Sequence, residues 1–339
     1  MALHHRVCHL CEAMCGLVIE HDGAGHIGAI RGDEGDAFSR GHLCPKAYGL
    51  KDIHEDPDRL RVPQRRVGGP DDARWEPIGW DEALDEVAHR LGEVQREHGR
   101  DAVAFYQGNP TVHNYAGALF GQVFSRALGS KSRYSATSVD QLPHMLAALE
   151  MFGHQLYLPI PDIDRTDLFV VLGGNPLVSN GSLMTAPDMR GRLKSLRERG
   201  GRLIVIDPRR TETAALADEH HFIRPGTDAL LLAALAHVIV TSGQARLGAL
   251  AAHTDGLEAL IAAVAPFTPA AVAPHVGMTA AAIEALAHTI ARARSAALYG
   301  RVGVSTQSFG ALACWLLYAL SVVTGNLDRP GGSMFTRPA

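Results

Sequence analysis

The stretch LFVVLGGNP, residues 168–176, decides the fold of this chain of 339 residues. Five consecutive apolar residues, 168–172, run directly into Gly173-Gly174-Asn175-Pro176. A short apolar run that ends in turn residues is typical of a strand buried on both faces. Glycines at its end let the backbone approach a ligand at the carboxyl edge of a parallel sheet, although a Gly-Gly turn after a strand is also common without a ligand.

Strands and helices alternate on both sides of this stretch. The pattern predicts strands at residues 203–206 and 296–299, and helices at residues 188–199, 228–242 (capped by Asp228) and 279–292 (capped by Thr279). Short apolar strands that alternate with helices indicate a parallel sheet covered on both faces. The fold class is therefore α/β.

The first half of the chain has a different pattern. We expect strands at residues 16–20, 26–31 and 102–106, a connecting loop at 56–74, and helices at 81–99, 115–128 and 141–152. Asp81 is the expected cap of the first of these helices, and Gly99 its end. Residues 1–58 contain too few apolar residues to fold by packing alone, so metal binding is expected to stabilise them.

Four of the five cysteines, Cys8, Cys11, Cys15 and Cys44, follow the pattern C-x2-C-x3-C-x28-C. Such spacing brings four thiolates around one soft metal centre, either a 4Fe-4S cluster or a zinc ion. Zinc sites usually combine two C-x2-C pairs, so the triplet favours the cluster. Disulfides are a third alternative and the weakest, because the chain is long and has no secretory leader.

Composition excludes several classes of protein. Hydrophobic residues make up 46% and charged residues 20%, which is typical of a soluble globular protein, and a net charge of −4 argues against nucleic-acid binding. The apolar run at residues 311–323 is shorter than the roughly 20 residues of a membrane span, so it predicts a buried helix. No G-x-G-x-x-G follows a strand, so NAD binding is not supported. We expect a cytoplasmic protein without membrane insertion.

The cysteine triplet, the return to Cys44-Pro45-Lys46 and the turn Pro330-Gly331-Gly332 resemble the molybdopterin oxidoreductases of the dimethyl sulfoxide reductase type. This family includes formate dehydrogenases and nitrate reductases, and the resemblance extends over residues 7–332. It implies a 4Fe-4S domain at residues 1–58 and the first half of a mixed α/β domain at 59–155. A Rossmann-like domain that binds molybdopterin guanine dinucleotide would occupy 156–339. The family's C-terminal domain is expected to be absent.

The resemblance also assigns two residues near the redox centres. Lys46 matches a lysine that lies between the cluster and the pterin and assists electron transfer; the alternative is a solvated surface lysine. Asp140 falls where the protein ligand to molybdenum or tungsten sits, and a carboxylate oxygen suits such a hard centre. Alternatively, Ser138 or Asp140 caps the helix at 141–152. The next residue is Gln141, whereas formate dehydrogenases have histidine there, which argues against formate as substrate.

The remaining site residues are those that the family uses for the pterin nucleotide. Asp207 and Asp228 would accept hydrogen bonds from guanine, and Arg209 would lie near the phosphates. The alternative for Asp228 is a purely structural role as a helix cap, and the two roles are compatible. The spacing of Gln307 departs by one residue from the common family pattern. The positions that match are Gly174, Asn175, Asp207, Arg209, Gly226, Thr227, Asp228 and Gln307.

The function that this resemblance implies is the two-electron redox reaction of a small substrate at molybdenum or tungsten. Electrons would pass through the pterin and Lys46 to the 4Fe-4S cluster, and then to a redox partner, which is an iron–sulfur or flavin subunit or a ferredoxin-like carrier. Two other classes stay open. In the first class, the chain is an electron-transfer or split-enzyme subunit that needs a second chain. In the second class, it is a non-enzymatic, zinc-bound nucleotide-binding protein.

Overall fold

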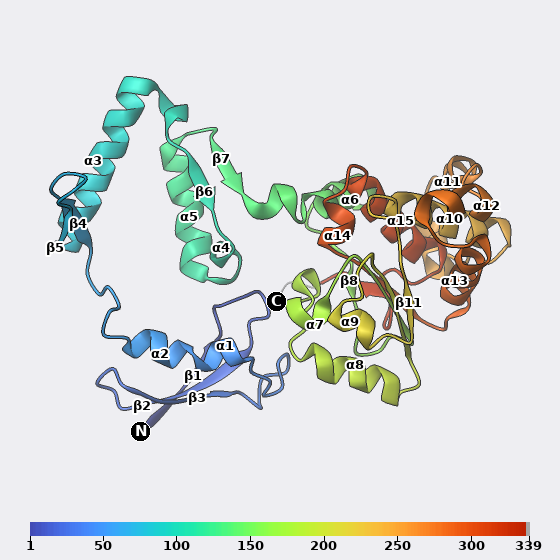
Figure 1. Cartoon of the computed structure of the whole chain (residues 1–339), viewed down its shortest axis with the longest axis horizontal. Coiled ribbons are helices and arrows are strands. Elements are labelled where there is room, and N and C mark those ends of the chain that lie inside the picture. The colour runs from blue at the N-terminus through green and yellow to red at the C-terminus, as the bar shows by residue number, and fades with distance from the viewer. Residues whose placement is uncertain (337–339) are drawn as a thin grey trace. The chain divides into compact units, whose positions relative to one another are not determined.

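The structure, a computed structural model, describes residues 1–336. It consists of two compact units, Met1–Ala136 and Thr137–Ala339, each of which is drawn in Figure 1. This division differs from the sequence-based boundaries after residues 58 and 155. The helix α6 (Leu142–Phe152) packs in the second unit, because its residues Ala147 and Ala148 are buried in that unit's core.

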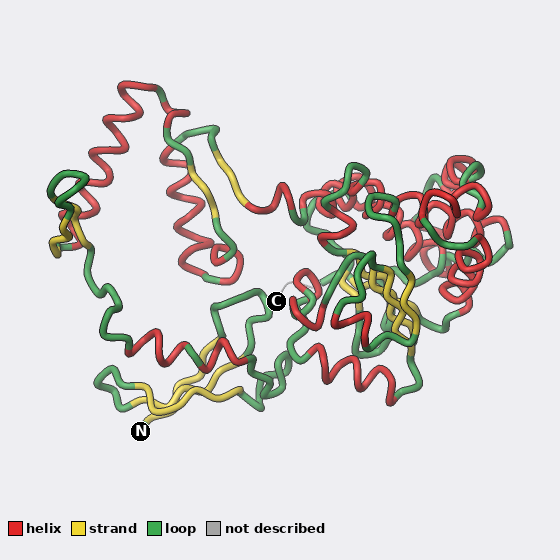
Figure 2. Tube along the Cα trace, viewed as in Figure 1, coloured by secondary structure: helices red, strands yellow, loops and turns green. Residues whose placement is uncertain are grey.

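The second unit is built on a four-stranded parallel sheet in the order β11-β10-β9-β12. Figure 2 draws the strands in yellow and the helices in red. Its strands are β9 (Leu168–Leu172), β10 (Arg202–Ile206), β11 (Glu219–His221) and β12 (Ala296–Gly300). The three strands expected from their apolar runs are confirmed. The edge strand β11 was not expected, since it contains no apolar residue.

Helices cover both faces of this sheet, and alternate residues of β9 point into two separate cores. Phe169 and Val171 lie in a smaller core with α8 (Met189–Glu198) and α9 (Glu212–Ala215). Val170 lies in a large core with α6, α10 (Asp228–Thr241), α11 (Leu257–Val264), α12 (Pro269–Val276), α13 (Ala280–Arg292) and α15 (Gly310–Val323). Full burial of such side chains contributes about 1.5–3 kcal/mol each. The α/β class predicted from the sequence is confirmed.

The helices of the second unit agree with most of the sequence-based predictions. Thr279 caps α13 through a side-chain hydrogen bond, as predicted, and Asp188 caps α8 in the same way. Thr227, not Asp228, occupies the cap position of α10, and Asp228 is its first residue. The bounds are α7 (Pro176–Ser179), α8 (Met189–Glu198), α9 (Glu212–Ala215), α10 (Asp228–Thr241), α11 (Leu257–Val264), α12 (Pro269–Val276), α13 (Ala280–Arg292), α14 (Val302–Ser305) and α15 (Gly310–Val323).

The chain order of the strands creates a topological switch point. From β9 the chain proceeds to β10 and β11 on one side, and it later returns to β12 on the other side of β9. The loops that leave β9 and β12 therefore diverge at the carboxyl edge of the sheet, which is where open α/β sheets bind ligands. A short antiparallel pair, β8 (Ile160–Pro161) and β13 (Ser333–Met334), completes the unit.

The first unit begins with an antiparallel sheet of β1 (Ala2–Val7), β2 (Gly16–His21) and β3 (Ile27–Gly32). Two short helices follow, α1 (Pro45–Tyr48) and α2 (Leu50–Glu55). The stretch 56–74, expected to be a loop, contains β4 (Gln64–Val67), which forms a hairpin with β5 (Arg74–Pro77). That expectation was wrong for β4, because glycine and proline marked the hairpin turn rather than an unstructured connection.

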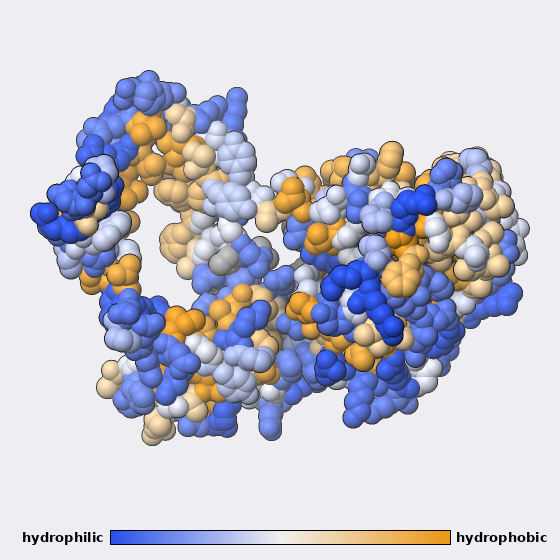
Figure 3. All heavy atoms as spheres, viewed as in Figure 1, coloured by the Kyte–Doolittle hydropathy of each residue, from blue (hydrophilic) through white to orange (hydrophobic). Residues whose placement is uncertain are grey.

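The rest of the first unit buries little apolar surface. It comprises α3 (Trp80–His98), α4 (Pro110–His113), α5 (Tyr115–Leu128) and a two-stranded parallel sheet of β6 (Phe105–Gln107) and β7 (Arg133–Ser135). Gly79, not Asp81, is the cap of α3, and α3 has no buried residue. Large apolar side chains of α5, including Leu119 and Phe120, are exposed, and Figure 3 shows apolar atoms on the surface of this part of the molecule.

No single helix within residues 1–336 has both the length and the apolarity to cross a membrane; the bent pair α11 and α12, at 64°, passes that test only when the two helices are taken together. The apolar run at 311–323 lies in α15, a mostly buried helix, as predicted.

Candidate functional site

The backbones that leave β9 and β12 touch at the switch point. Gly173 has φ +53°, and a Cβ atom there would lie 2.8 Å from backbone atoms of Gly303. The N–H of Gly303 donates to the carbonyl oxygen of Gly173 at 3.0 Å. This approach leaves no room for a side chain at Gly173, so the glycines predicted from the sequence as a ligand loop also join two strands directly.

Asp140 lies at the same edge of the sheet, and its side chain does not cap α6. No side chain caps this helix, whose cap position is Gln141. Instead, Oδ1 of Asp140 accepts a hydrogen bond of 2.8 Å from Arg301, the first residue after β12. The Ser305 hydroxyl donates to the Asp140 carbonyl oxygen at 2.6 Å. The capping alternative for Asp140 is therefore wrong.

Arg301 is the more deeply buried partner of this ion pair. Its side chain is 8% exposed, against 39% for Asp140. One guanidinium nitrogen, Nη1, is buried and has no hydrogen-bond partner within residues 1–336. A Cβ atom at Gly174 would lie 3.3 Å from both the Arg301 Cβ and the Tyr299 ring, so glycine at 174 makes room for the arginine.

The side chain of Asn175 is used within the fold. Its Oδ1 accepts from the backbone and hydroxyl of Thr213 at 3.2 and 2.7 Å, and its Nδ2 donates to Glu212 at 2.6 Å. These bonds fix the loop after β9 to α9. Asn175 therefore positions the loop through its side chain, and its backbone lies at the sheet edge.

Asp207 and Arg209 follow β10 at the carboxyl edge. The carboxylate of the nearly buried Asp207 accepts from the Arg209 N–H at 2.8 Å and so closes a tight turn. The Arg209 side chain is exposed and lies 3.6 Å from Glu212. Its guanidinium is thus accessible to an anion at the edge of the sheet.

Gly226, Thr227, Asp228 and Gln307 form the outer part of this edge. Gln307 donates to the Gly303 carbonyl at 2.8 Å, and its Oε1 would lie 3.5 Å from a Cβ atom at Gly226. Thr227 donates from its hydroxyl to the Arg224 carbonyl at 2.7 Å.

Asp228 is a buried carboxyl with an altered acidity. Burial raises the pKa of Asp228 to about 6, and the charge of Asp207 also raises it. The two carboxyls are therefore close enough to repel each other when both are charged. A ligand that donates hydrogen bonds to both would relieve that repulsion.

The sequence patterns did not single out Ser305 or His144 as parts of this site, and they gave Arg301 no role of its own. Arg301 directly follows an entirely buried strand, and a charged residue in that place is the signal that could have identified it. The ring Nδ1 of His144 lies 3.0 Å from the Tyr318 hydroxyl. Burial, with Arg301 nearby, lowers the pKa of His144 to about 4, so this side chain is neutral at pH 7.

The four N-terminal cysteines lie in the first unit, and all five cysteines of the chain are free thiols. Cys8 and Cys15 are buried, Cys11 and Cys44 are half-buried, and the Cys8 N–H donates to the Cys15 carbonyl at 2.8 Å. Burial raises the pKa of Cys15 to about 11, and the charges of the other three thiolates add to this rise.

Lys46 acts electrostatically on this group of thiols. The pKa of Cys8 is raised, chiefly by burial and also by the charges of Cys11 and Cys44. The charge of Lys46 offsets part of this rise. Lys46 itself is exposed. Within residues 1–336, no group of three or more His, Cys, Asp or Glu side chains is arranged to hold a metal ion.

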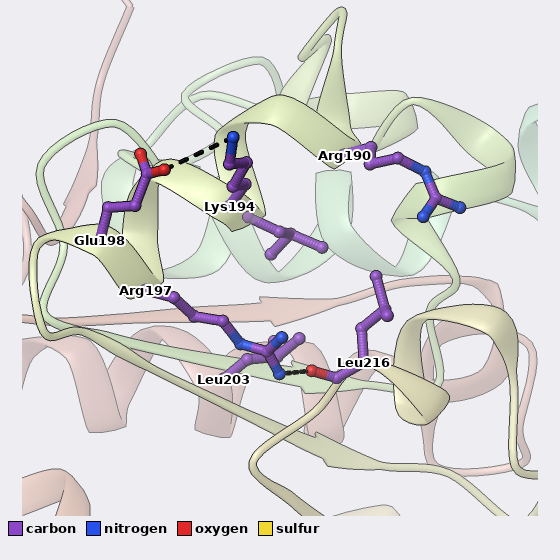
Figure 4. Close-up of a pocket in the computed structure, with 7 residues that line it drawn as sticks. Arg190, Lys194, Arg197, Glu198, Leu203 and Leu216 are labelled. Atoms are coloured by element: carbon purple, nitrogen blue, oxygen red, sulfur yellow. Dashed lines mark hydrogen bonds and ion pairs between the residues drawn. The ribbon is translucent and has the colours of Figure 1, made fainter.

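A separate cavity of about 410 Å³ lies between α8 and β10 (Figure 4). Arg190, Lys194 and Arg197 surround it, and Lys194 pairs with Glu198 while Arg197 donates to the Leu216 carbonyl. Leu203, near the amino end of β10, lines this cavity. Asp140, Arg301 and the carboxyl-edge loops do not line it.

Comparisons with known proteins give matches over most of the chain. The family model described as molybdopterin oxidoreductase matches residues 59–337. Formate dehydrogenase H of Escherichia coli (strain K12) is 31% identical over 332 residues, covering 96% of this chain and 45% of that protein. A nitrate reductase of Symbiobacterium thermophilum is 29% identical over 343 residues, covering 97% of this chain and 44% of that protein.

A solved structure shares the fold over nearly all of the chain. Acetylene hydratase from Pelobacter acetylenicus matches with a TM-score of 0.80 and 25% identity, covering 95% of this chain and 43% of that one. The chain thus spans less than half the length of these relatives.

Proposed function

We propose that this chain, which belongs to the molybdopterin oxidoreductase family, carries part of the active site of a two-electron oxidoreductase for a small substrate. In this proposal molybdenum or tungsten is bound by molybdopterin guanine dinucleotide, two of which serve one metal, and a 4Fe-4S cluster transfers the electrons. The bound cofactor supplies the redox chemistry, and the protein supplies a ligand, orientation and electrostatics.

The observation that carries the proposal is the convergence at the switch point. Asp140 and Arg301 pair at 2.8 Å beside the backbone contact between Gly173 and Gly303, at the edge where α/β sheets bind nucleotides. A carboxylate that is 39% exposed fits a hard, high-valent metal ion.

The nucleotide part of the cofactor suits the outer edge of the same sheet. Asp207 and Asp228 would accept hydrogen bonds from guanine N–H groups, and such bonds would offset the mutual repulsion of the two carboxyls. Arg209 would bind phosphate. The backbone at Gly174, Asn175, Gly226 and Thr227, together with Gln307, would line the remainder.

For the first unit we propose that Cys8, Cys11, Cys15 and Cys44 bind the 4Fe-4S cluster. Their mutual charge effects support a common site, because thiols that shift each other's pKa lie near one another. Ligation would replace four protons by iron and relieve this repulsion. Lys46, whose charge already stabilises the Cys8 thiolate, would favour the electron on the cluster.

The substrate, partner and location are parts of the same proposal. Gln141, where formate dehydrogenases have histidine, argues for a substrate other than formate. Electrons would leave for an iron–sulfur or flavin subunit, or for a ferredoxin-like carrier. We propose a cytoplasmic location.

A second candidate is a subunit that works only with another polypeptide, either for electron transfer or as one part of a split enzyme. The two-stranded parallel sheet of β6 and β7 favours this candidate. Parallel sheets usually have more strands and are covered on both faces, so a second polypeptide would supply what this sheet lacks. The exposed apolar residues of α3 and α5 support it as well.

Metal and nucleotide analysis tests the proposed function. The chain is purified without oxygen, and iron, sulfide, zinc, molybdenum, tungsten and acid-released guanine nucleotide are measured per polypeptide. About four irons with stoichiometric molybdenum or tungsten and nucleotide are expected. Iron alone would favour the electron-transfer subunit, and zinc without iron would contradict the proposal.

A further inference from the structure

Arg301 occupies an unusual place for an arginine. It follows the wholly buried strand β12, its N–H donates to the Leu172 carbonyl at 3.2 Å, and its side chain is more than nine-tenths buried. A guanidinium stays charged under all ordinary conditions, so its burial requires a counter-charge. Asp140, 161 positions earlier in the chain, is that counter-charge.

We infer that Arg301 is the positioning residue for Asp140, and that it directs one carboxylate oxygen of Asp140 toward the metal. The inference rests on the proposed function, since it concerns the same site. Oδ1 accepts the hydrogen bond from Arg301, and Oδ2 has no hydrogen-bond partner within residues 1–336. Oδ2 is therefore the oxygen that is left for a metal ion.

Two hydrogen bonds of Ser305 hold this arrangement to the sheet. The Ser305 hydroxyl binds the Asp140 carbonyl at 2.6 Å, and the Ser305 N–H donates to the Arg301 carbonyl at 3.0 Å. Gly174 leaves space for the arginine stem. Asp140 is thereby tied to the rigid end of β12, although it belongs to a different part of the sequence, which is how a ligand side chain is held in one orientation.

The buried Nη1 of Arg301 is a second sign that this residue does more than stabilise the fold. A charged donor without a partner costs free energy, and such groups are rare in folded proteins. The ion pair between Arg294 and Asp167 provides the contrast. Arg294 is exposed, and its Nε and Nη2 atoms donate to the two oxygens of the carboxylate, at 2.8 and 2.7 Å. It is an exposed pair at the amino end of β9, away from the carboxyl edge.

The experiment compares Arg301→Met, Arg301→Lys and Asp140→Asn with the control Asp167→Asn in the anaerobically purified full chain. Metal and guanine nucleotide are counted per polypeptide, and X-ray absorption at the molybdenum or tungsten edge gives the oxygen ligands of the metal. Arg301→Met should reproduce the change in metal–oxygen coordination seen in Asp140→Asn, while the nucleotide content stays near the wild-type value. Arg301→Lys should restore part of the wild-type spectrum, and Asp167→Asn should leave it unchanged.

The outcomes separate this inference from the function on which it rests. Wild-type protein without molybdenum or tungsten would overturn both. Metal in the wild type together with an unchanged spectrum in Arg301→Met would overturn the positioning role alone. Where Arg301→Met fails to fold, Arg301→Gln takes its place, because it also removes the charge that pairs with Asp140. An altered coordination in Arg301→Gln beside a wild-type one in the control would support the role, whereas an unaltered coordination in Arg301→Gln would refute it.

Discussion

Asp228 is the residue whose chemistry is most altered by its surroundings. It lies at the start of α10 and is 6% exposed. Its pKa rises from the ordinary value of 3.8 to about 6, first because of burial and then because of Asp207. The folded protein therefore keeps a proton on Asp228 at pH values where the unfolded chain has already released it.

This acidity predicts a pH dependence of stability. A raised pKa favours the folded state below the pKa of the unfolded chain, and the advantage is lost as the pH rises from about 4 to about 6. The free energy of unfolding of the wild type should fall across this window relative to Asp228→Asn, by about 1–3 kcal/mol. Denaturant unfolding of both proteins, without bound nucleotide, at pH 4.5, 5.5 and 7 measures it. A constant difference between the two would contradict the raised pKa.

Asp228 also predicts how the nucleotide binds. Hydrogen bonds from a guanine would stabilise the charged carboxyl, so Asp228→Asn should reduce the guanine nucleotide retained per polypeptide, by roughly tenfold if one charge-assisted bond is lost. Chromatography of the acid-released nucleotide gives the value. Glu258→Gln, at an exposed position of α11 away from this edge, is the control and should retain the wild-type amount.

At the scale of elements, the contact between the loops that follow β9 and β12 depends on Gly173 and Gly303, because neither residue has a side chain. Gly173→Ala would place a Cβ atom 2.8 Å from the backbone of Gly303 at a φ of +53°. We expect a loss of about 2–4 kcal/mol in the free energy of unfolding, since backbone strain and overpacking add. The matched control is Gly200→Ala, which has φ +79° but no atom within 4 Å, and which should cost about 1 kcal/mol. Equal losses in the two variants would show that the close approach is unimportant.

The elements that could be predicted from the sequence are those whose own residues show a clear hydrophobic pattern. The strands β9, β10 and β12 consist mainly of apolar residues, because both of their faces are covered. The strand β11, Glu-His-His, carries no such pattern and is a strand only because it pairs with β10. The hairpin of β4 and β5 was missed for a similar reason, since its short strands are polar and its turn resembles a loop.

The candidate site was likewise predictable only where the local sequence determines the position of a residue. Gly174, Asp207 and Asp228 directly follow strands or begin a helix, so their place at the sheet edge follows from local sequence. The pairing of Asp140 with Arg301 was not predictable, because it joins residues 161 positions apart through the tertiary fold. For Asp140, a helix cap and a contact to another strand have the same local sequence, and only the fold distinguishes them.

At the scale of the whole molecule, the two units differ in how completely they bury apolar residues. The second unit has two cores, one on each face of its sheet. In the first unit, a cluster of buried apolar residues includes Cys8 and Cys15, and the helix α3 buries no residue. Its packing therefore involves the same thiols that are proposed to bind iron.

This difference predicts different behaviour of two fragments. Residues 137–339, expressed alone, should unfold in one cooperative transition, because the sheet and both layers of helices lie within them. Residues 1–136 without metal should unfold gradually and bind an apolar dye such as ANS, since α5 exposes Tyr115, Leu119 and Phe120. Circular dichroism during denaturant titration, with dye fluorescence, tests both. A sharp transition in fragment 1–136 without metal would contradict the expectation.

Because Cys314 is buried in α15, a reagent can count the accessible thiols of the folded chain without reacting with this one. Its side chain is inaccessible, and burial raises the pKa of this thiol to about 12, so it is hardly ever the reactive thiolate. In folded, metal-free protein a chromogenic disulfide reagent should react rapidly with the half-buried Cys11 and Cys44, slowly with Cys8 and Cys15, and with Cys314 only after unfolding. The number of fast thiols that disappear on reconstitution would then measure cluster occupancy by absorbance alone, with the fifth cysteine as an internal record of whether the second unit was folded.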